Sequence, residues 1–169
     1  MSAVIDDARA ETRTEPKSTS AAAGTLDALI IGAGFSGLYQ LHQIRDHLGL
    51  NALVLEAADG RAAVRLPFRP DLLRPGGTVS GPALMGLADV AMWAALLGVT
   101  GGRDESVTST MTVNFLRPFA PGPVLAEARL LKRGKRMVFG EVLLRAEASE
   151  EVSAHVTTTW AVIGPTAPA

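Results

Sequence analysis

Residues 75–102 read PGGTVSGPALMGLADVAMWAALLGVTGG, and this stretch decides the fold. It predicts one long helix that begins after Ser80, a suitable N-cap residue, with Pro82 at an early position where a missing N–H does no harm. We expect this helix to run to about Leu97 and to stop at Gly98. Its residues are apolar nearly all the way round, which is typical of a helix buried in a protein core.

Asp89 is the one charged residue of this helix, and it lies one turn from Met85 and one turn from Trp93. A carboxylate in apolar surroundings is costly unless it is paired, hydrogen-bonded or protonated. Asp89 is therefore either a structural group bonded to a buried donor, or a general base or nucleophile whose pKa is tuned by desolvation. The central charge and the flanking glycines argue against a membrane span.

The composition excludes several classes of protein. The chain has 169 residues, enough for one domain with extensions, and its net charge of −1 gives no reason to expect a nucleic acid or an acidic membrane as partner. It has no cysteine, which excludes disulfides, thiolate nucleophiles and zinc–sulfur sites. The three histidines are not spaced as metal ligands, so we expect no metal site. The N-terminus lacks the apolar region of a signal peptide, and we expect a cytoplasmic protein.

The first 51 residues do not follow the pattern of the rest. Residues 1–25 are rich in Ala, Ser, Thr and charge, and we predict a disordered tail, as we predict a loose tail for residues 165–169. Residues 26–51 contain a short apolar strand, a glycine turn and an amphipathic helix, the setting of a dinucleotide-binding fingerprint. The glycines of that turn are Gly32, Gly34 and Gly37.

This fragment, about residues 26–50, resembles the N-terminal FAD-binding fingerprint of flavin monooxygenases of the Baeyer–Villiger type. In that family a second glycine-rich run follows, and here the chain continues with GRAAVRLPFRPD instead. We therefore expect a fused or truncated remnant rather than a working FAD site. Glu56 lies about where a ribose ligand would be, but it belongs more naturally to the first strand of the domain that follows.

From Ala52 onward the pattern is that of β-strands. The segments ALVLEAA and AAVRLPF flank Asp59-Gly60, a strong signal for a two-residue hairpin turn. After the helix we predict four strands, at residues 106–116, 124–131, 137–145 and 152–163. In the first of them we expect alternating faces, with Val107, Met111, Val113 and Phe115 against Thr108, Thr110, Thr112 and Asn114.

One long buried helix followed by an antiparallel meander is an α+β arrangement in which the sheet must wrap around the helix, the hotdog architecture. Three segments, GRAAVRLPFRPDLLRPGG, SGPALMGLADVAMWAALL and STMTVNFLRP, resemble acyl-CoA thioesterases of the PaaI-like hotdog superfamily. The resemblance covers about residues 52–163, so we predict a hotdog domain over residues 52–164 behind a short β-α appendage. It implies hydrolysis of acyl-CoA thioesters by a homodimer or a dimer of dimers, with coenzyme A thioester as substrate and no required cofactor.

The resemblance also assigns roles to residues around the helix. An Asp at the position of Asp89 acts as general base or nucleophile, and the N–H at the helix start, here that of Gly81, is the oxyanion donor in a site between two protomers. The family turn His-Gly-Gly is Ser80-Gly81-Pro82 here, and a common Asn of the family is Arg74. Ser80 is an N-cap first and a catalytic helper second.

Coenzyme A would need cations for its phosphates. Arg117 at a strand end is one candidate. Another is a basic cluster in the turn between the strands predicted at residues 124–131 and 137–145, although a solvated turn explains this cluster more simply. The cluster consists of Lys132, Arg133, Lys135 and Arg136. Two other functions stay open. One is a hotdog dimer that binds an acyl-CoA or apolar ligand without cleaving it, and the other is an FAD-binding protein based on the fingerprint glycines.

Overall fold

The computed structural model describes residues 51–103 and 106–164. The predicted tails and the flavin-like fragment with Gly32, Gly34 and Gly37 lie outside the described residues, so these predictions stay predictions. A short 3₁₀ helix η2 (Pro70–Leu72) and one long helix α2 (Gly81–Thr100) accompany six strands. The strands are β1 (Leu53–Ala58), β2 (Arg61–Leu66), β3 (Ser106–Phe115), β4 (Val124–Arg133), β5 (Met137–Ala146) and β6 (Ala154–Val162).

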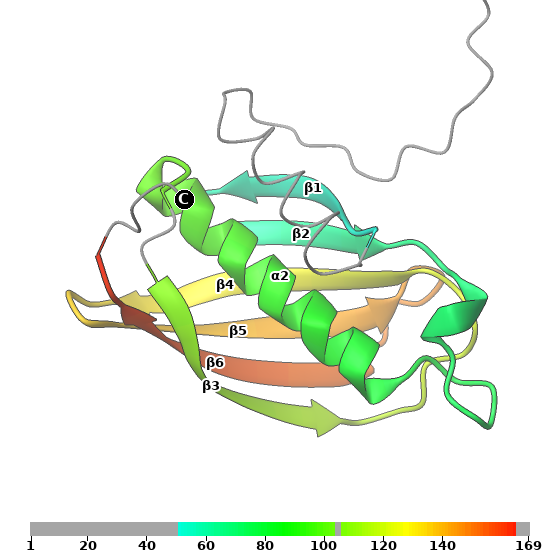
Figure 1. The fold of residues 1–169 in the computed structure, drawn as a ribbon. Coiled ribbons are helices and arrows are strands. Elements are labelled where there is room, and N and C mark those ends of the chain that lie inside the picture. Colours follow the sequence, from blue (N-terminus) through cyan, green and yellow to red (C-terminus); the bar gives the residue numbers. More distant parts are fainter. Residues whose placement is uncertain (1–50, 104–105, 165–169) are drawn as a thin grey trace, which may run out of the picture.

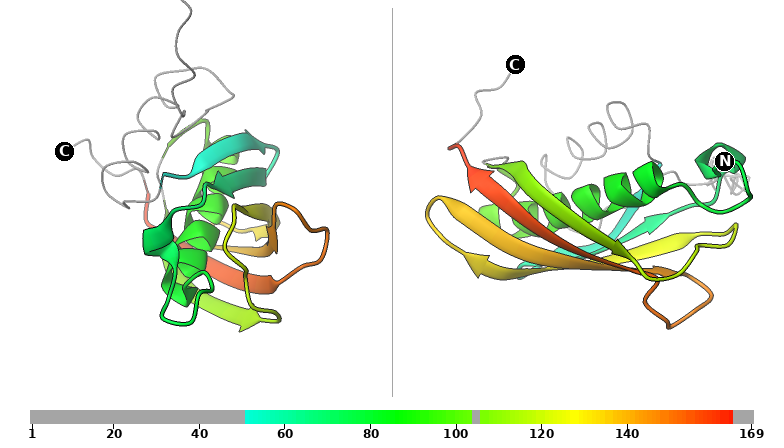
Figure 2. Two further views of the ribbon diagram at one scale, coloured as in Figure 1. Left: turned by 90° about the vertical axis from the view of Figure 1, so that its right-hand side faces the viewer. Right: turned by 90° about the horizontal axis from the view of Figure 1, so that it is seen from below.

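The strands form a single antiparallel sheet in the order β1-β2-β4-β5-β6-β3 (Figure 1). Helix α2 crosses one face of this sheet, and the sheet curves around the helix (Figure 2). Most of the helix is buried, and its buried residues are largely small or aliphatic, among them Leu84, Leu87, Ala88, Ala91 and Ala95. This arrangement of an antiparallel sheet around one buried helix confirms the predicted hotdog fold.

By length and hydropathy alone α2 could cross a membrane. In this fold it is the core helix, because its apolar side packs on strands β1, β2, β4 and β5. The helix approaches β5 very closely at Met92, which lies directly over Gly140 and has none of its surface exposed. A Cβ atom at Gly140 would collide with the Met92 side chain and lie 2.9 Å from the Arg129 carbonyl oxygen.

The turns explain where the elements begin and end. Asp59 and Gly60 have φ angles of 50° and 75° and join β1 to β2, which confirms the predicted two-residue hairpin. The predicted helix end was wrong, because α2 runs past Gly98 and is ended by Gly101, whose φ is 66°. Gly98 instead permits a close helix–strand contact, since a Cβ there would lie 3.2 Å from the Ala57 carbonyl carbon.

The four strands predicted after the helix are confirmed, but β3 contains a β-bulge between Thr108 and Thr110. Thr108 pairs with Trp160, which is 4% exposed on the helix-facing side of β6, so Thr108 faces α2 as well. Val107 faces away and is 47% exposed. The predicted faces of Val107 and Thr108 were therefore wrong, because the extra residue of a bulge shifts the alternation.

Candidate active site

Asp89 lies half-buried on α2, opposite β3. The hydroxyl of Thr108 donates a hydrogen bond to Asp89 Oδ1 at 2.7 Å. Burial raises the pKa of Asp89 above its ordinary value, and the bond from Thr108 opposes that rise. The carboxylate is thus fixed in orientation through one oxygen and partly desolvated, an arrangement that suits both a structural group and a base.

The sequence pattern did not point to Thr108. In a regular strand every second residue faces the helix, so the helix-facing position before Met111 would be residue 109, and Thr108 would face away. The bulge brings the Thr108 hydroxyl to Asp89 instead. Bulges that re-aim a side chain are common beside active sites, but no local sequence signal here marks the extra residue.

Ser80 lies at the predicted N-cap position of α2. Ser80 has extended φ and ψ angles of −71° and 145°, and Pro82 lies in the first turn, yet the Ser80 side chain makes no capping hydrogen bond. The Ser80 N–H donates to the Leu72 carbonyl at 2.8 Å, and the Leu84 N–H donates to the Ser80 carbonyl at 3.2 Å. Gly81 is the first residue of α2, so its N–H has no acceptor within the helix and points to an outside acceptor.

A cavity of about 400 Å³ opens at this end of the helix. Gly81 and Leu84 of α2 form one wall, and Phe115 and Phe119 from the end of β3 and the segment after it form another. The loop before α2 is tied to that segment, because the Val79 N–H donates to the Phe119 carbonyl at 3.0 Å. The cavity therefore has apolar walls around the backbone donor of Gly81, while Ser80 is not among its lining residues.

Two arginines, Arg74 and Arg117, are also among the residues that line this cavity. Arg74 Nε donates to the Thr78 hydroxyl at 2.9 Å. Arg117 donates to the Val152 carbonyl at 2.9 Å and pairs with Glu151 at 3.3 Å. Both side chains are thus held in place by neutral or acidic groups of neighbouring loops.

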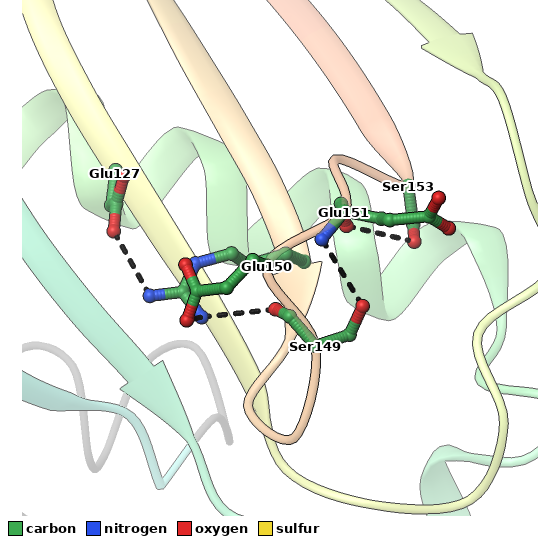
Figure 3. A network of polar contacts seen from close by, with 6 residues as sticks. Glu127, Ser149, Glu150, Glu151 and Ser153 are labelled. Atoms are coloured by element: carbon green, nitrogen blue, oxygen red, sulfur yellow. Dashed lines mark hydrogen bonds and ion pairs between the residues drawn. The ribbon is translucent and has the colours of Figure 1, made fainter.

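The loop that holds Arg117 is itself ordered by a network of polar contacts between β5 and β6 (Figure 3). The Ser149 hydroxyl accepts from the Glu151 N–H at 3.1 Å, and the Ser153 hydroxyl donates to the Glu151 carbonyl at 3.5 Å. Arg145 donates to the Ser149 carbonyl at 3.0 Å and pairs with Glu127 at 3.4 Å. This network fixes the backbone that presents the Val152 carbonyl to Arg117.

The structure brings together Gly81 and Arg117 of the predicted site residues, but it does not bring Asp89 to them. Asp89 lies eight positions after Gly81 on the helix, a rise of about 12 Å. A thioester carbonyl bound at Gly81 is therefore beyond the reach of the Asp89 carboxylate of the same chain.

The other polar groups that could take part in chemistry lie away from this cavity. His155 is on the opposite face of the sheet from α2, where its Nε2 lies 3.3 Å from Glu141. In the basic cluster, Arg133 donates to the Val99 carbonyl at the far end of α2 from Gly81. Within residues 51–103 and 106–164, no group of three or more His, Asp or Glu side chains could hold a metal ion.

A family model described as "Thioesterase superfamily" matches residues 76–153, from the loop before α2 to the end of the β5–β6 loop. The solved structure of a conserved protein from Pseudomonas aeruginosa is 32% identical, with a TM-score of 0.66, and the match covers 73% of this chain and 97% of that one. The chain belongs to the thioesterase superfamily. The hotdog resemblance predicted from residues 52–163 is thereby confirmed.

Two more relatives of this thioesterase superfamily chain carry informative names. A mutant of the phenylacetic acid degradation protein PaaI from Thermus thermophilus is 28% identical with a TM-score of 0.61, and the match covers 68% of this chain and 96% of that one. A Saccharolobus solfataricus protein named "Putative esterase SSO2140" is 28% identical over 114 residues, which is 68% of this chain and 80% of the relative.

Proposed function

We propose that this protein hydrolyses acyl-CoA thioesters, with Asp89 as the base and the Gly81 N–H as the oxyanion donor. The observation that carries the proposal is the state of Asp89. Its carboxylate is partly desolvated, its pKa is raised, and Thr108 donates a hydrogen bond of 2.7 Å to one of its oxygens. A raised pKa makes the ionised carboxylate a stronger base, and Oδ2 is the oxygen that Thr108 leaves for a proton.

In the proposed reaction Asp89 Oδ2 accepts a proton from a water molecule as the water oxygen attacks the thioester carbonyl carbon. The carbonyl oxygen becomes an oxyanion and accepts a hydrogen bond from Gly81 at the positive end of the α2 dipole. Collapse of this intermediate breaks the carbon–sulfur bond, and the proton passes from Asp89 to the departing thiolate. The products are a free carboxylic acid and coenzyme A.

This reaction needs two copies of the chain, because Gly81 and Asp89 of one copy are too far apart. Strand β3 suggests how the copies pair. It is an edge strand of ten residues whose outer side has no partner in the described part of the chain, and a long bare edge favours pairing with another strand.

The contacts of β3 give this pairing a useful consequence. Phe115 at one end of β3 lies against the helix start, 3.5 Å from a Cβ built on Gly81, and Thr108 toward the other end bonds to Asp89. Antiparallel pairing of β3 with its own copy around a two-fold axis would bring the Gly81 end of one chain beside the Asp89 end of the other. The exposed side chain of Met85, 42% accessible, would be covered there.

The first test is thiol release from a panel of acyl-CoAs of different chain length, followed with a thiol-reactive dye. The protein contributes no background, since it has no cysteine. Wild-type protein should release thiol, and Asp89→Asn, which keeps the size of the side chain, should lose at least about 100-fold in kcat/KM.

Two outcomes would contradict the proposal. Unchanged turnover in folded Asp89→Asn would remove Asp89 from the mechanism. Tight binding of acyl-CoAs without release by the wild type would favour a binding protein instead, an alternative suggested by Pro82, which leaves one N–H fewer at the helix start.

A further inference from the structure

We propose that the cavity at the start of α2 binds a carboxylate at the far end of the acyl group, so that the preferred substrates are thioesters of short dicarboxylic acids. This inference rests on the proposed function, because it assumes that the thioester carbonyl lies at Gly81. The proposed hydrolysis does not specify the acyl group of the substrate, and the inference adds that preference.

The charge of the cavity is the first argument. Arg74, Arg117 and the positive end of α2 meet in one space of about 400 Å³, and none of its described lining residues is acidic. Glu151 pairs with Arg117, but no carboxylate of the described chain pairs with Arg74. Like charges gathered in a partly apolar cavity repel one another, and an anionic ligand group would relieve that repulsion.

The geometry of the two arginines is the second argument. Arg74 is bonded to Thr78 through Nε and Arg117 to Val152 through its Nη1, so each is oriented before a ligand arrives. Guanidinium groups bind carboxylates through two parallel N–H donors, and a side chain that is already oriented loses less entropy on binding.

The position of the cations favours the acyl carboxylate over the phosphates of coenzyme A. Both arginines share a cavity with Gly81, whereas the pantetheine arm keeps the CoA phosphates far from the thioester carbonyl. The lining of the same cavity includes Leu84 and Phe119, which suit a short hydrocarbon spacer. A neutral acyl group would fill these walls but leave the Arg74 guanidinium without an anion.

The experiment compares two acyl groups that differ only in charge. Succinyl and butyryl thioesters are prepared both of coenzyme A and of N-acetylcysteamine, which has no phosphate. For the wild type we expect a higher kcat/KM with succinyl than with butyryl in both series. Arg74→Gln should lower the succinyl-to-butyryl ratio by roughly 10-fold to 100-fold, the value of a charge-assisted hydrogen bond.

The matched control is Arg61→Gln, which removes one positive charge from an exposed position in β2 outside the cavity. It should leave the ratio unchanged, which separates a local contact from general electrostatic steering. Arg74→Lys should retain only part of the preference, since an ammonium group lacks the planar fork.

Three results would overturn the inference. An equal loss of kcat/KM with succinyl and butyryl thioesters in Arg74→Gln would mean that Arg74 acts at the thioester carbonyl and does not bind the far end of the acyl group. A loss confined to the CoA series would assign the arginines to phosphates. A wild type that cleaves butyryl thioesters at least as well as succinyl would also contradict it, while leaving the proposed hydrolysis intact.

Failure of the proposed function gives a different result, namely no thiol release from any thioester. In that case calorimetric titration of the wild-type protein with the two N-acetylcysteamine thioesters tests the cavity alone. Tighter binding of the succinyl ester, lost in Arg74→Gln, would support the carboxylate site, and equal binding would overturn it.

Discussion

At the scale of single residues, the pair Asp89–Thr108 sets the pH dependence of the proposed reaction. The base must be ionised to accept a proton, so kcat/KM should fall as the pH drops through the raised pKa of Asp89. The hydrogen bond from Thr108 favours the ionised form and partly offsets the effect of burial.

Thr108→Val removes this bond with little change in shape. We expect the pKa of Asp89 to rise further, so the acid limb of the pH profile of kcat/KM should move to higher pH. The plateau at alkaline pH should change less, because there the base is ionised in both proteins. The control is Thr110→Val, an exposed residue of the same strand beyond the bulge. An unshifted acid limb in Thr108→Val would mean that the hydrogen bond between Thr108 and Asp89 does not affect the group that accepts the proton.

At the scale of elements, the start of α2 and the hairpin between β1 and β2 could be predicted from sequence, because each depends on local signals. Asp59-Gly60 marks a turn by its left-handed backbone angles, and Ser80 with Pro82 marks a helix start. The helix end could not be predicted. Gly98 resembles a glycine that ends a helix, but it lies within α2 and allows the helix to pack closely on Ala57 of β1, a contact between residues far apart in the sequence.

The candidate site was predictable in part for the same reason. Asp89 stands out as a lone charge in an apolar helix, and Ser80 marks the helix start, while the role of Gly81 is implied by the family resemblance. Thr108 and the cavity depend on tertiary structure, namely a bulge in β3 and the joining of two loops through Val79 and Phe119. Neither the bulge nor the contact between the two loops produces a periodic pattern of apolar residues that could be recognised in the sequence.

The contact between α2 and β5 gives a prediction about stability. An alanine in place of a strand glycine normally stabilises by reducing the freedom of the unfolded chain. Gly140→Ala should instead destabilise by about 1–3 kcal/mol, because its Cβ would collide with buried Met92 and approach the Arg129 carbonyl to 2.9 Å. Urea unfolding at one fixed protein concentration, followed by tryptophan fluorescence, measures the difference.

Gly122→Ala is the control, because a Cβ at that position meets nothing within 4 Å. Its free energy of unfolding should stay within about 0.5 kcal/mol of the wild type. A Gly140→Ala protein as stable as the wild type would mean that α2 can shift away from β5, and that the close Met92–Gly140 packing does not fix the position of the helix.

At the scale of the whole molecule, the proposed site exists only between two chains. Each dimer would hold two sites, and each site would take its base from one chain and its oxyanion donor from the other. Two variants separate these contributions. Asp89→Asn removes the base, and Gly81→Pro removes the donor N–H at a first helical position that tolerates proline.

Each variant alone should be nearly inactive, with a loss in kcat of about 10²–10³ for Gly81→Pro. A heterodimer of one Asp89→Asn chain and one Gly81→Pro chain, isolated through two different affinity tags, has both defects in one site and none in the other. It should therefore recover about half the rate of a wild-type heterodimer carrying the same tags. If both groups acted within one chain, neither chain of the mixed dimer would be intact and no rate would return. Recovery thus tests the shared site directly, because inactive parents can complement each other only across an interface that exchanges Asp89 and Gly81.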